Sequence, residues 1–237
     1  MYWLGFDTDQ VTDISPVRAL QGLKTLDCAG SSLRQGRLSD LTPLRGLPLI
    51  RLNCRESQVT NLEPLRGMPL EILHCHMTGV SSLAPLEDMK LSCLTIQGSC
   101  VTHLNPLRGM PLKWLDMASV RGVTDLKPLE DMPLAYLNLT DMLVSDLSVL
   151  TSLKSLERLV LDRLPVSDLG PLRGLPLTIL SFPGTRVTDL TPLLGLPLER
   201  VVLDYRPADE KILRSLPGLT MINNKPAAQF WKDLESK

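Results

Sequence analysis

A pentapeptide, Asp-Leu-x-Pro-Leu or a close variant of it, recurs along nearly the whole chain and constrains the fold more than any other feature. The central positions of its copies are Pro16, Pro43, Pro64, Pro85, Pro106, Pro128, Val149, Pro171 and Pro192. Neighbouring copies lie 21 or 22 residues apart, except for an interval of 27 residues between Pro16 and Pro43. A fixed period of this length indicates a stack of similar units, because each is too small to bury its own apolar face.

A second pattern, Leu-x-x-Leu-x-Leu, has the same period, and its last three residues alternate with the period of two that is typical of a strand. The last two apolar positions are Leu26/Cys28, Leu52/Cys54, Leu73/Cys75, Leu94/Ile96, Leu115/Met117, Leu137/Leu139, Leu159/Leu161, Leu180/Phe182 and Val201/Leu203. Leu4 and Phe6 have the spacing of one further copy, which makes ten. The chain holds 51 leucines but only nine aromatic residues (three each of Trp, Tyr and Phe), so the stacked core is expected to be mainly leucine.

The rest of each copy favours one short helical turn. An aspartate lies three residues before the central position in six copies, where its carboxylate would cap that turn, with the proline in the first turn. These aspartates are Asp13, Asp40, Asp125, Asp146, Asp168 and Asp189. A Gly-x-Pro sequence such as Gly46-Leu47-Pro48 then ends the turn. Within about 21 residues per copy, only a 3₁₀ helix fits comfortably on the return side.

The pattern resembles the leucine-rich-repeat family over essentially the whole chain, and most of all its short bacterial repeats of the internalin type. The resemblance implies an α/β repeat solenoid: a leucine-rich-repeat horseshoe with a concave parallel β-sheet, convex turns and 3₁₀ helices, and a C-terminal helical cap. Two features depart from the family. The asparagine that usually follows the strand is replaced by Ser57, Thr78, Ser99 or Thr185, so no asparagine ladder is expected. Residues 31–37 are inserted and should form a bulging loop.

The end of the chain differs from the repeats. Residues 206–216 have the pattern of an amphipathic pair of helical turns, residues 219–222 restore the strand spacing, and Pro226 marks a helix start. We expect residues 1–206 to form the solenoid, with a truncated first coil, and residues 207–237 to form a cap. This closing segment is similar to that of leucine-rich-repeat regions downstream of bacterial serine/threonine protein kinases. Because the chain starts within a repeat, we expect it to be a fragment of a larger architecture.

Charge and cysteine content indicate which classes of ligand and which cellular location to expect. The net charge of −1 gives no electrostatic footprint for nucleic acid or an anionic membrane, and no apolar run approaches the length of a membrane span. The first residues lack the pattern of a signal peptide. Five cysteines without framework spacing fit a reducing compartment, so a cytoplasmic location is expected.

The resemblance implies that the concave sheet is the binding surface, and strand alternation predicts that side chains at positions 3, 5 and 7 of the second pattern line it. Trp114, Tyr136 and Arg158 fall at position 3 of consecutive strands. Exposed aromatic rings beside an arginine are typical of an interface hot spot, although the rings could instead stack on each other and on Arg158 to stabilise the sheet. The candidate partner-binding residues are Trp114, Tyr136, Arg158, Asp116, Asn138, Asp162, Arg51, Arg55, His74 and His76.

His74-Cys75-His76 has the composition of a metal site, but the alternation of a strand turns Cys75 towards the core, away from both histidines. Cys93 or Gln97 could join the histidines, yet no suitable fourth ligand is evident. We therefore expect neither a metal nor another cofactor.

The chain contains none of the sequence motifs of phosphate-binding loops, dinucleotide-binding folds, kinases, serine hydrolases or zinc proteases. The sequence predicts a non-enzymatic protein-protein interaction module that binds a protein partner on its concave face, with no nucleic acid, membrane or small-molecule substrate. The alternative is a sensor or regulatory region attached to a bacterial serine/threonine protein kinase.

Overall fold

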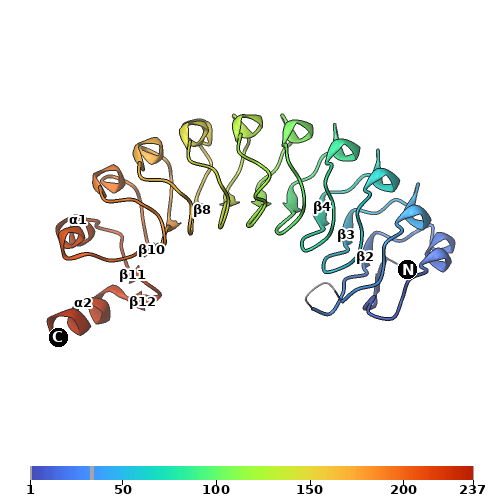
Figure 1. Ribbon diagram of the computed structural model, residues 1–237, viewed down its shortest axis with the longest axis horizontal. Coiled ribbons are helices and arrows are strands. Elements are labelled where there is room, and N and C mark those ends of the chain that lie inside the picture. Colours follow the sequence, from blue (N-terminus) through green and yellow to red (C-terminus); the bar gives the residue numbers. More distant parts are fainter. Residues whose placement is uncertain (1, 33–34, 237) are drawn as a thin grey trace.

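The computed structural model describes residues 2–32 and 35–236, so Leu33 and Arg34 of the expected inserted loop lie outside the described residues. The chain forms an open arc with a 12-stranded sheet on its inner side (Figure 1). The strands are β1 (Trp3–Gly5), β2 (Thr25–Asp27), β3 (Arg51–Asn53), β4 (Ile72–His74), β5 (Cys93–Thr95), β6 (Trp114–Asp116), β7 (Tyr136–Asn138), β8 (Arg158–Val160), β9 (Ile179–Ser181), β10 (Arg200–Val202), β11 (Met221–Ile222) and β12 (Lys225–Pro226).

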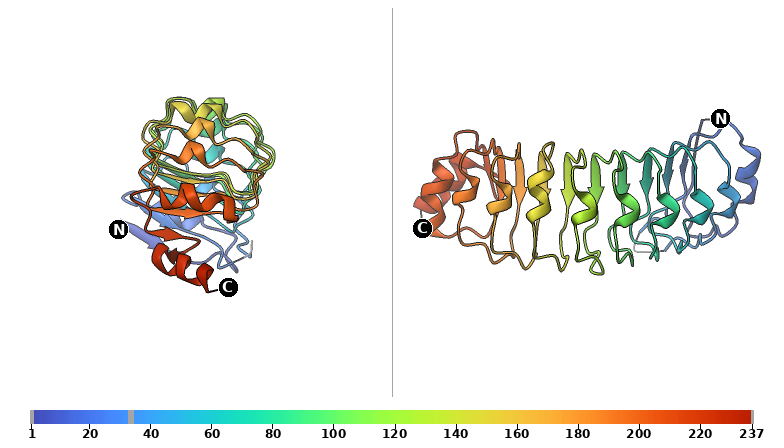
Figure 2. Two further views of the ribbon diagram at one scale, coloured as in Figure 1. Left: turned by 90° about the vertical axis from the view of Figure 1, so that its left-hand side faces the viewer. Right: turned by 90° about the horizontal axis from the view of Figure 1, so that it is seen from above.

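Strands follow one another in chain order, and β1 to β11 are parallel. Each pairs with the next in the register that the repeat predicts, as in Leu52↔Leu73 and Leu115↔Leu137. The views in Figure 2 show the coils stacked along one axis, with the strands side by side. This architecture confirms the predicted leucine-rich-repeat solenoid.

Short 3₁₀ helices line the outer side of the arc (Figure 1), as the 21-residue period predicts. They are η1 (Ser15–Ala19), η2 (Thr42–Leu44), η3 (Glu63–Leu65), η4 (Ala84–Leu86), η5 (Asn105–Leu107), η6 (Lys127–Leu129), η7 (Ser148–Ser152), η8 (Gly170–Leu172), η9 (Thr191–Leu193) and η10 (Pro207–Asp209). Helices α1 (Glu210–Arg214) and α2 (Ala227–Glu235) lie near the C-terminus. No helix in the described part of the chain is long and apolar enough to cross a membrane.

The core runs between the sheet and the 3₁₀ helices as one continuous apolar cluster. Equivalent leucines stack from coil to coil, and Leu26, Leu73 and Leu115 are fully buried. Cys28, Cys54 and Cys75 take the same position on neighbouring strands and are buried free thiols. Burial raises the pKa of the Cys54 thiol to about 12, so this cysteine behaves as a small apolar side chain.

The six predicted capping aspartates bind the first turns of their own 3₁₀ helices, although each lies one residue before the formal N-cap, such as Leu41 in η2 and Leu147 in η7. Asp40 accepts a hydrogen bond from the Thr42 amide at 2.7 Å, and Asp146 accepts one from the Ser148 amide at 2.8 Å. Hydrogen bonds from the Thr42 side chain and then its amide lower the pKa of Asp40, and those from the Ser148 amide and then its side chain lower the pKa of Asp146, because they stabilise the carboxylate.

Hydroxyl side chains replace the family's asparagine at the turn after the strand. Ser57 Oγ and Thr78 Oγ1 each donate a 2.6 Å hydrogen bond to the backbone carbonyl of the residue three positions earlier, Cys54 and Cys75 respectively. Thr185 Oγ1 donates in the same way to the Phe182 carbonyl at 2.8 Å. These three hydroxyls close the turn within their own coils, whereas the buried Ser99 Oγ makes no hydrogen bond within the described residues.

The C-terminal segment continues the sheet and then folds over its end. Val201 pairs with Ile222 in parallel register, and β12 turns back antiparallel to β11. Helix α2 begins directly after Pro226, as predicted, and places Phe230 and Trp231 against Tyr205 with edge-to-face centroid distances of 5.3 and 6.0 Å. These aromatic contacts cover the last coil.

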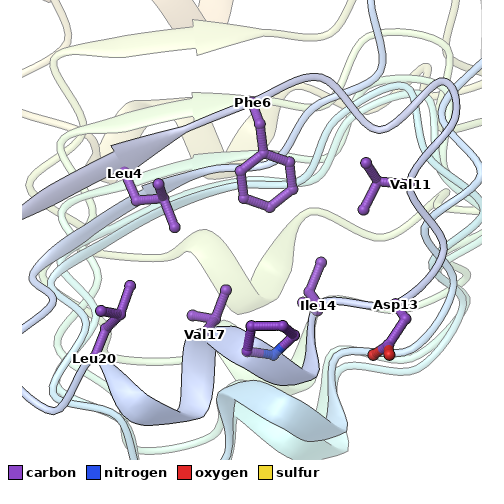
Figure 3. Close-up of a pocket in the computed structure, with 8 residues that line it drawn as sticks. Leu4, Phe6, Val11, Asp13, Ile14, Val17 and Leu20 are labelled. Atoms are coloured by element: carbon purple, nitrogen blue, oxygen red, sulfur yellow. The ribbon is translucent and has the colours of Figure 1, made fainter.

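At the N-terminal end, the described residues leave a hollow open. Leu4, Phe6 and Val11 on one side face Ile14, Val17 and Leu20 on the other, across a hollow of about 420 Å³ (Figure 3). Nearby, Gly30 and Gly36 hold the base of the inserted loop, where a Cβ on Gly30 would lie only 2.3 Å from the Glu56 carbonyl oxygen. Glycine is thus required for this close approach of two backbones.

Candidate partner-binding surface

The register places three of the predicted residues next to one another on the concave face. Trp114 on β6 pairs with Tyr136 on β7, which pairs with Arg158 on β8. Leu115, Leu137 and Leu159, each one residue later, are fully buried in the core. The strand alternation therefore turns all three position-3 side chains away from the core, as predicted.

Trp114 and Tyr136 stack on each other, with ring centroids 3.8 Å apart and planes inclined by 14°. Trp114 remains 39% exposed, although its ring covers part of Tyr136. Two stacked rings form a rigid, partly apolar platform that loses little conformational freedom when a partner covers it. Arg158 is exposed and makes no cation–π contact or ion pair within the described residues, so of the alternative, in which the rings stack on each other and on Arg158, the first contact forms and the second does not.

Polar groups surround the Tyr136 hydroxyl. Burial raises the pKa of Tyr136, and the negative charges of Asp116 and Asp162 raise it further. The pKa of Tyr136 is lowered by a hydrogen bond with Asn138 and by the positive charge of Arg158, which partly offset the increase. The structure thus brings together Trp114, Tyr136, Asp116, Asn138, Arg158 and Asp162, which we call the aromatic cluster.

Hydrogen bonds at the strand ends orient the polar members of the aromatic cluster. Asn138 Oδ1 accepts from the amide and the hydroxyl of Thr140, at 3.0 and 2.7 Å. Asp116 Oδ1 accepts from the Ala118 amide at 3.1 Å, and Asp162 Oδ1 accepts from Ser181 Oγ at 2.6 Å. These side chains are therefore held in place before any partner binds, which reduces the entropy cost of binding.

The other four predicted residues, Arg51, Arg55, His74 and His76, lie together on β3, β4 and the turns that follow them; we call them the basic cluster. Both histidines are half-buried, and the Nδ1 atoms of His74 and His76 lie 3.1 and 3.0 Å from the same atom, Thr95 Oγ1. Thr95 itself is buried. One hydroxyl on the neighbouring strand thus fixes both rings.

The pKa of each histidine is lowered, chiefly by burial. For His74, the charges of His76, Arg55 and Arg51 lower it further, and Asp27 opposes them. For His76, Arg55 lowers the pKa while Glu56 and Asp116 raise it. Asp116 therefore acts on His76 as well as on Tyr136, and the two clusters form one continuous surface from β3 to β8.

The sequence did not single out Thr95 as a site residue. The sequence feature that could have identified Thr95 is its location at position 5 of β5, where it pairs with His74 in the register. Only the side-chain geometry shows that the rings of His74 and His76 both turn towards its hydroxyl. Among residues 2–32 and 35–236, no three His, Cys, Asp or Glu side chains meet in a group that could hold a metal ion.

No protein-family model and no curated protein sequence matches the chain. Solved structures do match. An internalin (InlF) from Listeria monocytogenes is 25% identical with a TM-score of 0.65, over 93% of this chain and 66% of that one. Internalin C2 from the same species is 26% identical with a TM-score of 0.61, over 85% of this chain and 80% of that one.

A leucine-rich-repeat protein from Leptospira interrogans has the higher TM-score of 0.70 at 23% identity, over 89% of this chain. This chain spans 57% of the Leptospira protein and 66% of internalin F, so it corresponds to part of each. These similarities to bacterial proteins support the leucine-rich-repeat family and establish its solenoid fold for this chain.

Proposed function

Starting from this leucine-rich-repeat fold, we propose that the chain is a non-enzymatic protein-protein interaction module that binds a protein partner on its concave face. The observation that carries the proposal is the stacked, partly exposed Trp114–Tyr136 pair in the middle of that face. Tryptophan, tyrosine and arginine dominate the binding energy of protein interfaces, and here Arg158 lies on the next strand.

The shape of the surface favours a macromolecular partner. The aromatic cluster lies on the inner face of an open arc, where a partner can contact several strands at once (Figure 1). Adjacent parallel strands are about 4.8 Å apart, so the surface from β3 to β8 extends over roughly 24 Å. That breadth matches a protein better than a small molecule, which is usually enclosed by a pocket.

The expected cytoplasmic location stays a prediction, as does the division into a solenoid of residues 1–206 and a cap of residues 207–237. The kinase-linked alternative likewise stays a prediction, resting only on the similarity of the closing segment to kinase-associated regions. The genomic sequence that flanks the coding region distinguishes the two functions, because a kinase domain in the same reading frame favours regulation in cis.

The test combines partner identification with substitution. A photoreactive amino acid at Ile179, on the concave side of β9, should cross-link a partner that mass spectrometry identifies, whereas the same group at the convex Thr151 should not. Affinity for that partner is then measured for Trp114→Ala/Arg158→Ala. One hot-spot residue contributes about 2 kcal/mol or more, so the dissociation constant should rise at least about 30-fold even if only one of the two substitutions removes such a residue.

The matched control is Tyr2→Ala/Arg173→Ala, which removes an exposed aromatic residue and an exposed arginine outside the surface. This variant should bind like the unsubstituted chain. Equal binding by the Trp114→Ala/Arg158→Ala variant would contradict the concave-face proposal.

A further inference from the structure

We propose that the basic cluster is a carboxylate-binding subsite that receives an acidic segment of the protein partner. This inference rests on the proposed interaction function and deepens it, because it names the chemistry that the N-terminal half of the concave face recognises. The proposal rests on the register, the charge and the hydrogen bonds of four residues, Arg51, Arg55, His74 and His76.

The register sets the four side chains side by side. Arg51 and Arg55 lie at positions 3 and 7 of one coil, so both face the concave side, and both are exposed. Asn53 pairs with His74, and the amide of Glu56 binds the His76 carbonyl at 3.0 Å, which keeps Arg55 beside His76 on the adjoining strand. Four residues along a strand span roughly 13 Å, a length suited to several carboxylates in an extended segment.

Among the described residues, the two arginines have no carboxylate partner. Elsewhere in the described chain, Arg66, Arg163, Arg206 and Arg214 each bind a carboxylate within 4 Å. No ion pair or side-chain hydrogen bond involves the guanidinium of Arg51 or Arg55 within the same described residues. The neighbouring Asp27 instead accepts from Asn53 Nδ2 at 3.1 Å and from the Ala29 amide at 3.3 Å.

Thr95 leaves one edge of each imidazole ring available for a ligand. Its hydroxyl has one hydrogen, so in the neutral pair it donates to one Nδ1 and accepts from the other. The Nε2 atoms point to the opposite edges of the rings and have no protein partner among the described residues. When both rings are protonated, both Nδ1–H groups donate to Thr95 Oγ1, and both Nε2–H groups become donors for a carboxylate.

Charge makes this recognition dependent on pH. Arg51 and Arg55 lower the pKa of His74, and Arg55 lowers that of His76, while Asp27, Glu56 and Asp116 partly oppose them. A bound carboxylate would offset the arginine charges and raise both pKa values. Binding would then take up protons, so affinity should increase as the pH falls through the histidine range.

A fluorescent hexaaspartate peptide is the probe, and its affinity is measured by anisotropy from about pH 8 to about pH 5.5. We expect the intact chain to bind it more tightly at the lower pH and not to bind hexaasparagine. Arg51→Gln/Arg55→Gln should weaken binding at least about tenfold, since each charge-assisted hydrogen bond removed is worth about tenfold or more. The His74→Gln/His76→Gln variant should still bind hexaaspartate at the higher pH. Its affinity for the peptide should not increase at the lower pH.

The matched control is Arg45→Gln/Arg108→Gln, which removes two exposed convex arginines and should leave affinity unchanged. An equal loss in this control, or no hexaaspartate binding by the intact chain, would overturn the subsite. In NMR spectra, the signals of His74 and His76 should shift to higher midpoints with the peptide, and the third histidine, His103, should not respond.

The two proposals fail separately. Trp114→Ala/Arg158→Ala should leave hexaaspartate affinity unchanged, because those residues lie outside the basic cluster. If that variant loses the protein partner while no variant affects the peptide, the acidic-segment inference falls and the concave-face proposal stands. If the peptide behaves as expected while the double substitution of Trp114 and Arg158 leaves partner binding unchanged, the carboxylate subsite stands and the role of the aromatic cluster in partner binding falls.

Discussion

At the scale of single residues, Thr95 shows how one hydroxyl determines the behaviour of two titratable side chains. It holds both His74 and His76 in half-buried positions where neutral imidazole is favoured, and the nearby arginines strengthen that preference. Recognition of an acidic partner and stability of the free chain are therefore linked through the same protons.

The histidine pair should make the free chain less stable in mild acid. Both folded-state pKa values are lowered, so the unfolded chain takes up protons first as the pH falls below about 6.5, the ordinary histidine value. The stabilisation is fully present above that value and is lost as the pH falls towards the lowered folded-state values. Urea unfolding at about pH 7.5 and about pH 5.5 should therefore show a smaller loss for His74→Gln/His76→Gln than for the intact chain.

His103→Gln leaves the pair intact and is the control for this measurement. If the His74→Gln/His76→Gln variant and the intact chain lose stability equally on acidification, the histidine pair has no such role.

Much of the site could be predicted at the residue scale because strand alternation requires only the sequence period. It placed Trp114, Tyr136 and Arg158 on neighbouring strands of one face, which the register confirms. The alternation could not reveal that His74 and His76 share the Thr95 hydroxyl, or that Arg158 avoids both rings. Those features depend on side-chain rotamers, which the period does not determine.

At the scale of the element, the turn after the 3₁₀ helix explains why a copy of the repeat can carry either Pro-Leu-Arg-Gly, as at Pro43, or Pro-Leu-Glu-Asp, as at Pro85. The fourth residue takes a positive φ in both forms, +78° at Gly46 and +63° at Asp88. Glycine adopts this conformation freely, and aspartate is among the few other residues that tolerate it. The repeat therefore varies in charge here without changing its backbone.

Gly46→Val should destabilise the chain by about 1–2 kcal/mol, the cost of a left-handed backbone for a residue with a Cβ. Apart from Gly46 itself and its chain neighbours, no heavy atom of the described residues lies within 4 Å of the Cβ that would be added there, so contacts with them add nothing to this cost. Gly46→Asn, with a side chain that tolerates the same φ, is the control and should lose clearly less. Urea unfolding measures both, and equal losses would show that the turn is not the cause.

The sequence predicted the repeated elements and the helix that follows Pro226, but it missed one strand near the end of the described chain. Strand β12 pairs with β11 through the turn at Asn223 and Asn224, whose φ angles are +50° and +61°. Two asparagines with positive φ are typical of a two-residue hairpin, and this was the available signal. A strand of two residues that includes Pro226 has no alternation of its own to detect.

At the scale of the whole molecule, each coil contacts only its neighbours, so stability should vary along the arc. Both edges of a central coil are covered, whereas the first coil ends at the hollow beside Leu4 and Phe6 (Figure 3). The last coil depends on α2, in which Phe230 is buried against Tyr205 and Arg214 lies 4.2 Å from the centre of the Trp231 ring.

Phe230→Ala should weaken the C-terminal end by about 3–5 kcal/mol, as expected when a buried phenylalanine is removed. Hydrogen exchange should then become faster for the amides of β10 and β11, while those of β4 to β6 keep their protection. Leu194→Ala, at a half-exposed convex position, is the control and should change neither group. Faster exchange throughout the sheet would mean that the coils unfold as a single cooperative unit.

The scarcity of aromatic residues has a practical consequence for spectroscopy. The three tryptophans lie at Trp3 on the first strand, Trp114 at the centre of the arc and Trp231 in the closing helix. Variants that keep one tryptophan each would report fluorescence from the beginning, middle and end of the stack independently. The emission of Trp114 would also report occupancy of the concave face directly, so a partner could be detected without a label.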